Sequence, residues 1–198
     1  MRNPDAASAA LVLVDYQQRL LPAIHHAEDA IRHAVFLADV AHAIGLPVVG
    51  TEQDPHSLGA NDERIRSRCD ATLAKRHFDA CRDGLLPALA PGGRDLQEVV
   101  IAGCESHVCL AQTALGLLGA GLRVAVVPAA CGSRRPEDHA LAMQRLAQAG
   151  AVLLGHEAVA FEWLRTSEHP AFRQVLALVK GFPGAFPKAS SPASARAS

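Results

Sequence analysis

The sequence predicts a three-layer α-β-α fold, in which a six-stranded parallel sheet carries helices on both faces. Two observations lead to this prediction. Short apolar runs alternate along the chain with longer segments in which apolar residues recur at helical spacing. The first short run, residues 11–14, is wholly apolar, which is typical of a strand buried on both faces. Strands that alternate with helices form parallel sheets that are covered on both sides.

The six expected strands are apolar segments bounded by turn-forming or charged residues. They comprise residues 11–14, 47–50, 71–74, 99–102, 124–127 and 152–154. We expect the strand order 3-2-1-4-5-6, in which the first and fourth strands are neighbours at the point where the order reverses.

The segments between these strands carry helix signals. Residues 28–44 have apolar side chains at helical spacing, and Gly45 follows them as a stop. Residues 136–149 have a proline near their start and Gly150 just past their end. The other expected helices are a charged one near residues 63–68, one that ends at Gly119, and two short ones near residues 157–165 and 169–180.

Length and composition indicate one globular domain. The chain has 198 residues, 49% of them hydrophobic and 20% charged, and we assign residues 1–181 to this domain. Residues 182–198 are rich in proline and serine, which is the composition of a disordered end.

Charge and hydropathy exclude several classes of partner. The formal net charge is −1 and no basic run occurs, so we expect no nucleic-acid partner. A membrane span needs roughly 20 consecutive apolar residues, and the sequence contains no such run. The first apolar run is short and ends on Asp15, unlike a signal peptide, so we expect a cytoplasmic protein.

The cysteines and histidines do not form a disulfide or zinc pattern. Five cysteines are an odd number and include no CxxC pair, which favours reduced thiols. The ten histidines are scattered, without an HExxH motif or zinc-finger spacing.

Cys109 lies where the fourth expected strand is followed by a helix. The β-branched run ends at Gly103, and Ser106 is the expected helix N-cap, which places Cys109 in the first helical turn. The helix dipole would lower the pKa of a thiol there, and free N–H groups would stabilise an oxyanion. Alternatively, Cys109 is a small buried residue that packs the junction between strand and helix.

Two further reactive residues end expected strands. Asp15 follows the first strand and Lys75 follows the third. Each has a simpler interpretation, since an aspartate can cap a turn and a lysine can be solvated at the surface. Together with Cys109 they supply a base, a nucleophile and a charge that favours the ionised forms of both.

These residues belong to a longer ordered set of motifs, which spans about residues 10–180. The set comprises Leu13-Val14-Asp15-Tyr16-Gln17, Thr51-Glu52-Gln53, Leu58-Gly59, Lys75, Gly103-Cys104-Glu105-Ser106-His107-Val108-Cys109-Leu110, Gln112-Thr113-Ala114-Leu115, Ser133-Arg134 and Glu168-His169-Pro170-Ala171-Phe172. In these motifs the chain resembles the isochorismatase-like cysteine hydrolases, which include nicotinamidases and carbamoylsarcosine amidases, and is most similar to the isochorismatase-domain-containing branch.

The resemblance implies a catalytic triad of Asp15, Lys75 and Cys109. It also implies an oxyanion hole formed by the backbone N–H groups of Glu105 and Cys109, and a cis peptide bond between Cys104 and Glu105. Isochorismatase itself splits a vinyl ether and lacks the cysteine, so Cys109 indicates acyl chemistry on a C–N bond.

Two departures from related sequences bear on the substrate. Nicotinamidases bind a metal through an Asp-x-His motif and a further histidine, whereas residues 51–56 here place His56 out of step, so we expect no catalytic metal and no cofactor. Arg76 follows Lys75 where a small polar residue is usual. It either favours an anionic substrate or points away from the site, and strand alternation favours the second.

The leading hypothesis is a cofactor-independent cysteine hydrolase that acts on a small amide, with Leu20, Gln53, Phe78 and His107 as candidate substrate-binding residues. One alternative is a non-catalytic binding or scaffold protein that retains the fold. Another is a redox sensor in which Cys104 or Cys131 resolves an oxidised thiol. On family grounds we also expect a homo-oligomer, either a dimer or a tetramer.

Overall fold

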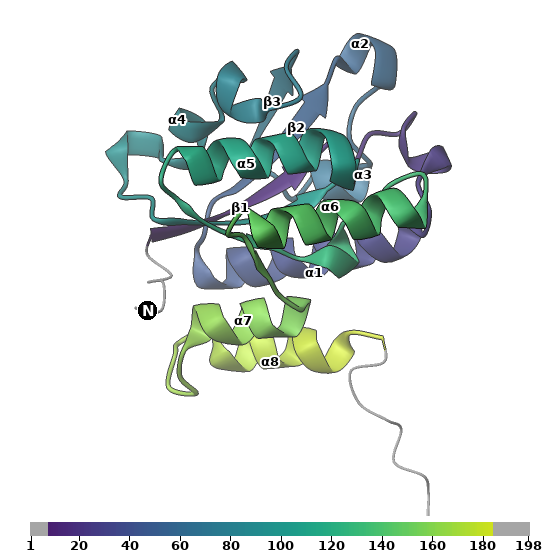
Figure 1. Ribbon diagram of the computed structural model, residues 1–198. Helices are drawn as coiled ribbons and strands as arrows, with labels where there is room; N and C mark the ends of the chain where they lie inside the picture. Colours follow the sequence, from purple (N-terminus) through teal and green to yellow (C-terminus); the bar gives the residue numbers. More distant parts are fainter. Residues whose placement is uncertain (1–7, 184–198) are drawn as a thin grey trace, which may run out of the picture.

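A computed structural model of the protein describes residues 8–183, so most of the expected disordered end lies outside the described residues. One parallel sheet forms its centre, with the strand order β3-β2-β1-β4-β5-β6 (Figure 1). The strands are β1 (Ala9–Val14), β2 (Val48–Gln53), β3 (Ala71–Lys75), β4 (Glu98–Gly103), β5 (Arg123–Val126) and β6 (Val152–Leu153). The predicted fold class and strand order are therefore confirmed.

Strand burial follows the position of each strand in the sheet. Every residue of β1 and β4, which lie at the centre, is buried, as their apolar sequences require. The edge strand β6 has only two residues, and Val152 and Leu153 are both exposed. This strand pairs with β5 alone, at the edge of the sheet where the predicted order places it.

The register brings the carboxyl ends of four strands to one edge of the sheet. Val14 lies opposite Thr51 on one side and Gly103 on the other. Gln53 and Lys75 are register partners at the ends of β2 and β3. This pairing with β3 is why β2 continues three residues beyond its predicted apolar segment.

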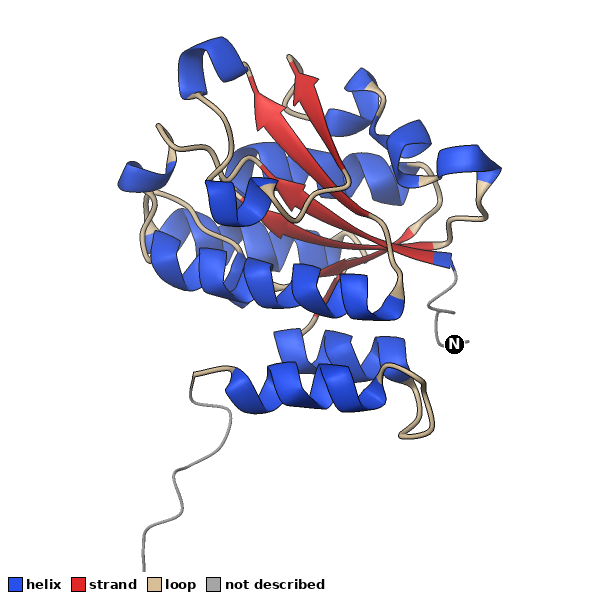
Figure 2. Cartoon of the chain, turned by 180° about the vertical axis from the view of Figure 1, so that it is seen from behind, coloured by secondary structure: helices blue, strands red, loops and turns tan. Residues whose placement is uncertain are grey.

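Helices cover both faces of the sheet. Helices α5 (Ala111–Gly119) and α6 (Pro136–Gln148) lie on one face, and α1 (Ala27–Ile44) lies on the other (Figures 1 and 2). Helices α7 (His156–Leu164) and α8 (Phe172–Gly181) lie side by side and pack against α1. The shorter helices are α2 (Pro55–Leu58), α3 (Glu63–Arg66) and α4 (Leu85–Leu89).

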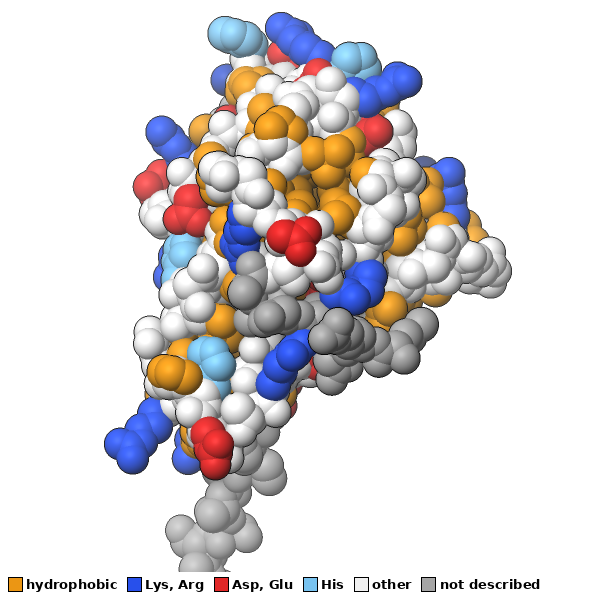
Figure 3. All heavy atoms as spheres, turned by 90° about the vertical axis from the view of Figure 1, so that its left-hand side faces the viewer, with side chains coloured by type: hydrophobic (Ala, Val, Ile, Leu, Met, Phe, Trp, Pro, Cys, Tyr) orange, Lys and Arg blue, Asp and Glu red, His pale blue; other side chains and the backbone are white. Residues whose placement is uncertain are grey.

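The surface is mixed in charge, in line with the composition. On the face in Figure 3, lysine and arginine side chains are interspersed with aspartate and glutamate. Within residues 8–183, none of the helices has the length and apolar character needed to span a membrane.

Candidate active site

Asp15 directly follows β1 and is fully buried. Its φ of 52° lies in the left-handed region that residues other than glycine seldom adopt. The Thr51 hydroxyl on β2 donates to Asp15 Oδ1 at 2.7 Å, and Lys75 Nζ lies 2.8 Å from Asp15 Oδ2. Both carboxylate oxygens are therefore held from neighbouring strands.

Lys75, the last residue of β3, is also buried. Neither its side chain nor that of Asp15 has any exposed surface. Besides this ion pair, its ammonium donates a hydrogen bond of 2.7 Å to Gln53 Oε1. A buried ion pair is tolerated when further hydrogen bonds complete its coordination, as here. The simpler interpretations of these two residues, a turn cap and a solvated surface lysine, do not fit this geometry.

Cys109 lies in a π-helical turn, Ser106–Leu110, between β4 and α5. Its side chain is buried, and its sulfur lies 4.0 Å from Gln53 Oε1. Gly103 makes the approach of this segment to β1 possible: its φ is 148°, and a Cβ there would lie 2.2 Å from the Val14 carbonyl oxygen. The peptide bond between Cys104 and Glu105 is cis, as the resemblance implies.

Two expectations about this turn are wrong. Ser106 does not cap a helix; the capping position is Glu105, which provides no side-chain cap, and Ser106 lies inside the turn. The pKa of Cys109 is raised to about 12, where the dipole argument predicted a lowered one. Burial is the main cause and the Asp15 carboxylate adds to it, while the Lys75 ammonium acts in the opposite direction.

Residues 104–107, which precede Cys109 in the chain, are tied to the loop between β5 and α6 and to the first turn of α6. Cys104 forms a β-bridge with Gly132, and the Ser106 N–H donates to the Gly132 carbonyl at 2.8 Å. The side-chain contacts are Glu105 Oε1 with Arg134 Nε at 2.9 Å, Ser106 Oγ with His139 Nδ1 at 2.9 Å, and His107 Nδ1 with Ser133 Oγ at 3.0 Å. These contacts fix the backbone that leads to Cys109.

Of the four candidate substrate-binding residues, Gln53 is the one hydrogen-bonded to the predicted triad. His107 contacts Ser133, and Leu20 is partly buried against the hydrophobic core. Phe78 is 49% exposed and lines a shallow depression with Arg76 and Asp79. Arg76 itself pairs with Asp54 at the surface, as strand alternation suggested.

Sequence reasoning missed the role of Gln17. This fully buried side chain accepts a hydrogen bond from the Gln53 N–H at 2.9 Å and donates to the Gln53 carbonyl at 3.0 Å. It also donates to the Gly59 carbonyl. The signal was present, because Gln17 and Gln53 both occur in the motifs that carry the resemblance.

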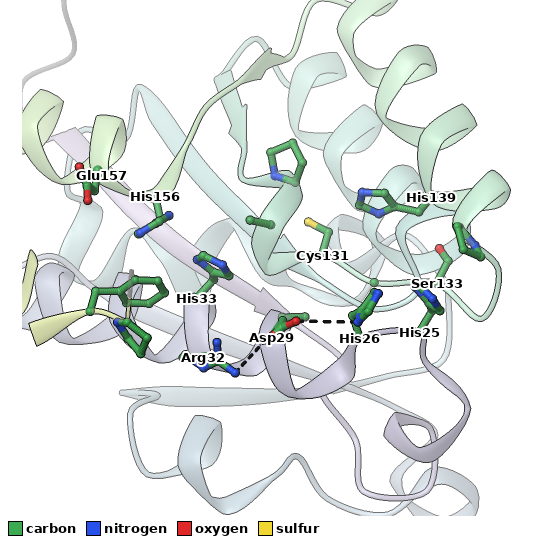
Figure 4. Close-up of a pocket in the computed structure, with 17 residues that line it drawn as sticks. His25, His26, Asp29, Arg32, His33, Cys131, Ser133, His139, His156 and Glu157 are labelled. Carbon is green, nitrogen blue, oxygen red and sulfur yellow. Dashed lines mark ion pairs between the residues drawn. The ribbon is translucent and has the colours of Figure 1, made fainter. Parts of the chain in front are cut away.

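A separate cavity of about 740 Å³ is lined by residues of α1, of the loop between β5 and α6, and of the first turns of α6 and α7 (Figure 4). Cys131 contributes a thiol to the lining of this cavity, which also includes His25, His26, His33, His139 and His156. Asp29 pairs there with Arg32 at 2.8 Å. Despite the many imidazoles, no group of three or more potential ligands in the described part of the chain is arranged to hold a metal ion.

Comparisons with known proteins agree with this architecture. A profile of the isochorismatase domain matches residues 9–158. Isochorismatase domain-containing protein 1 of Danio rerio is 35% identical over 181 residues, which are 90% of this chain and 63% of that protein. The chain thus spans less than two-thirds of that relative.

Two solved structures share the fold. The structure of MAR1 ribonuclease from Caenorhabditis elegans superposes with a TM-score of 0.85 at 29% identity, covering 96% of this chain and 100% of that one. The YcaC protein of Escherichia coli, described as an octameric hydrolase of unknown specificity, gives 0.80 at 25% identity over 89% of this chain and 90% of that one. With the profile match across the whole sheet, these similarities show that the chain belongs to the isochorismatase family.

Proposed function

We propose that this protein is a cofactor-independent cysteine hydrolase that cleaves an amide-type C–N bond of a small molecule. One observation carries the proposal: the Cys109 sulfur lies beside a fully buried Asp15–Lys75 ion pair that is in turn completed by Thr51 and Gln53. Burying two charges is expensive, so a fully buried ion pair beside a thiol needs a functional reason, and catalysis is a common one.

The proposed first step is a proton transfer within the site. With its pKa raised to about 12, Cys109 is a thiol at rest, and the Asp15 carboxylate is the base available to it. When the thiol proton moves to Asp15, the negative charge moves to the sulfur and the Lys75 ammonium still faces one anion. The net charge of the buried group is unchanged, so the transfer needs no counterion from solvent.

The sulfur then attacks the substrate carbonyl carbon. The N–H groups of Glu105 and Cys109 are the proposed donors to the oxyanion. As the C–N bond breaks, Asp15 returns its proton to the leaving nitrogen, and a thioester on Cys109 remains. Water, deprotonated by Asp15, hydrolyses the thioester and regenerates the thiol.

We also propose that the protein forms a homo-oligomer and that it is cytoplasmic. A homo-oligomer is supported by the octameric state of the Escherichia coli relative. We place the protein in the cytoplasm, where its five free cysteines would stay reduced. The assignment of residues 1–181 as the hydrolase domain stays a prediction.

The test is a panel of small primary and substituted amides, assayed for release of ammonia or amine. We expect at least one to be turned over by the wild type and none by Cys109→Ala, and we expect intact-mass measurement to detect an acyl adduct on the wild type alone. If no compound gives turnover that depends on Cys109, the protein is better described as a scaffold that retains the fold. A peroxide-induced disulfide from Cys109 to Cys104 or Cys131 would instead favour the redox sensor.

A further inference from the structure

The side chain of Gln53 lies between two members of the proposed triad, the cation Lys75 and the thiol Cys109. Its Oε1 atom accepts from Lys75 Nζ at 2.7 Å and lies 4.0 Å from the Cys109 sulfur. Its Nε2 atom donates to the Arg76 carbonyl at 2.8 Å. Because the amide nitrogen is committed to that carbonyl, the oxygen is the end that faces Lys75 and Cys109.

The Gln53 backbone is held as firmly as its side chain. Gln17 binds both its N–H and its carbonyl, and Gln17 follows Asp15 by two residues on the same strand end. The segment that supplies the proposed base therefore also fixes the residue that orients the ammonium. Gln53 and Lys75 are register partners, so this geometry is built into the sheet.

We propose that Gln53 is a positioning residue, which holds the Lys75 ammonium between Asp15 and Cys109, and that an uncharged acceptor is required there for Cys109 to react as a thiolate. The proposal rests on the triad of the proposed function. It replaces the expectation that Gln53 binds substrate.

The requirement for an uncharged acceptor follows from the charges in the site. The charged groups that act on Cys109 are Asp15 and Lys75, and Arg76 on the adjoining segment is paired with Asp54 at the surface. The Lys75 ammonium thus stabilises one negative charge. In the proposed mechanism this charge is on Asp15 at rest and on the Cys109 sulfur after proton transfer. A carboxylate at position 53 would add a second anion that competes for Lys75 and disfavours the thiolate.

The experiment measures alkylation of Cys109 by iodoacetamide, followed on the Cys109-containing peptide by mass spectrometry so that the other four cysteines do not interfere. Two variants are compared at equal pH, Gln53→Glu and Gln53→Met. We expect the Glu variant to react roughly tenfold or more slowly than wild type, since each unit of thiol pKa is tenfold in thiolate. The Met variant, which loses the hydrogen bond but adds no charge, should be only about threefold slower.

The expected order of alkylation rates, with Gln53→Glu slower than Gln53→Met, distinguishes an electrostatic role of Gln53 from a purely structural one. Glu keeps the length of the side chain and an oxygen for Lys75, so a structural role alone would leave Gln53→Glu closer to wild type than Gln53→Met. That result, or wild-type rates in both variants, would overturn the proposal. The matched control is Gln18→Glu, which adds the same charge at an exposed position in the segment that follows β1 and should react like wild type.

A second measurement covers the case in which Gln53→Glu does not fold. Gln17→Met removes both contacts to the Gln53 backbone and should slow Cys109 by about threefold, with no further loss in the double variant Gln17→Met/Gln53→Met. Additive losses would show that the two glutamines act separately. None of these rates needs a substrate, so an amide panel without turnover would defeat the proposed reaction and leave this result standing.

Discussion

Cys109, in the turn between β4 and α5, and Cys131, in the loop between β5 and α6, look alike by two common criteria. Each is 7% exposed, and burial raises the pKa of each to about 12. Their neighbours differ. Cys109 lies beside Asp15, Lys75 and Gln53, whereas Cys131 donates to the Val127 carbonyl and lines a cavity rich in imidazoles.

The difference shows that burial and pKa do not identify a nucleophile here. The Cys109 side holds the buried Asp15–Lys75 ion pair, which in the proposed mechanism exchanges a proton with the sulfur without a change in net charge. On the Cys131 side, burial lowers the pKa of His33, His139 and His156, which favours uncharged imidazoles near neutral pH. The two sides can therefore be separated by substitutions that alter charge at one and not at the other.

The largest expected effect comes from Asp15→Asn. The amide keeps an acceptor for Thr51 but cannot shuttle the proton, so amide turnover should fall by roughly 10³-fold or more. Alkylation of Cys109 should become faster, because Asp15 is one of the groups that raise the thiol pKa. His156→Phe, on the Cys131 side, should change neither rate by more than about tenfold, because the contacts of His156 are with other rings of that cavity. Slower alkylation in Asp15→Asn would contradict the assigned electrostatics.

Lys75→Met tests the cost of the buried pair. It leaves the Asp15 carboxylate buried without its cation, and we expect the free energy of unfolding in urea to fall by about 3–5 kcal/mol. The control is Arg134→Met, which removes the partner of Glu105 at a side chain that is 61% exposed. Solvent screening limits that loss to about 1 kcal/mol or less. Equal losses in the two variants would show that the Asp15–Lys75 pair is no more important to folding than a surface contact.

The smallest expected effect is a pH dependence that arises on the Cys131 side. Burial lowers the pKa of His33 to about 4 from an ordinary value near 6.5. Between these values the unfolded chain binds more protons, so stability falls as the pH drops through this window and is fully present above it. After allowance for partial exposure we expect about 1–2 kcal/mol between pH 7 and pH 4.

His33→Leu should remove most of this pH dependence of stability. The measurement is the thermal unfolding midpoint of the wild type and of His33→Leu across the same pH range. An unchanged slope in His33→Leu would mean that the acid sensitivity arises elsewhere. The ring contacts support the assignment: the His33 ring centroid lies 4.4 Å from that of His156 and 4.8 Å from that of Phe182, so a charge on His33 would be placed among packed rings.

Much of the fold could be predicted because its signals are local. The apolar run of residues 11–14 has no polar position, which fits the buried centre of a parallel sheet. Gly45 and Gly150 both have positive φ just past α1 and α6, as a helix stop requires. The sixth predicted strand, residues 152–154, corresponds to β6 at the edge of the sheet, where the predicted order places it.

The site was predictable in outline only. Asp15 and Lys75 each end a strand, and the strand order places those ends at one edge, so their approach follows from topology. The contacts from Ser106 to His139 and from His107 to Ser133 join segments about 30 residues apart in the chain. No local pattern marks such pairs. For this reason Ser106 was interpreted as a cap, and the coupling of Gln17 to Gln53 was missed.

The sequence by itself determined the alternation of strands and helices, the positions of Asp15, Lys75 and Cys109 at strand ends, and the membership of a family. These properties depend on hydrophobic periodicity and on ordered motifs, both of which are local features of the sequence. Only the tertiary structure decided the protonation of Cys109. The helix dipole that the sequence suggested is a weak field, whereas loss of solvent and the nearby Asp15 carboxylate are stronger, and both depend on how distant segments pack.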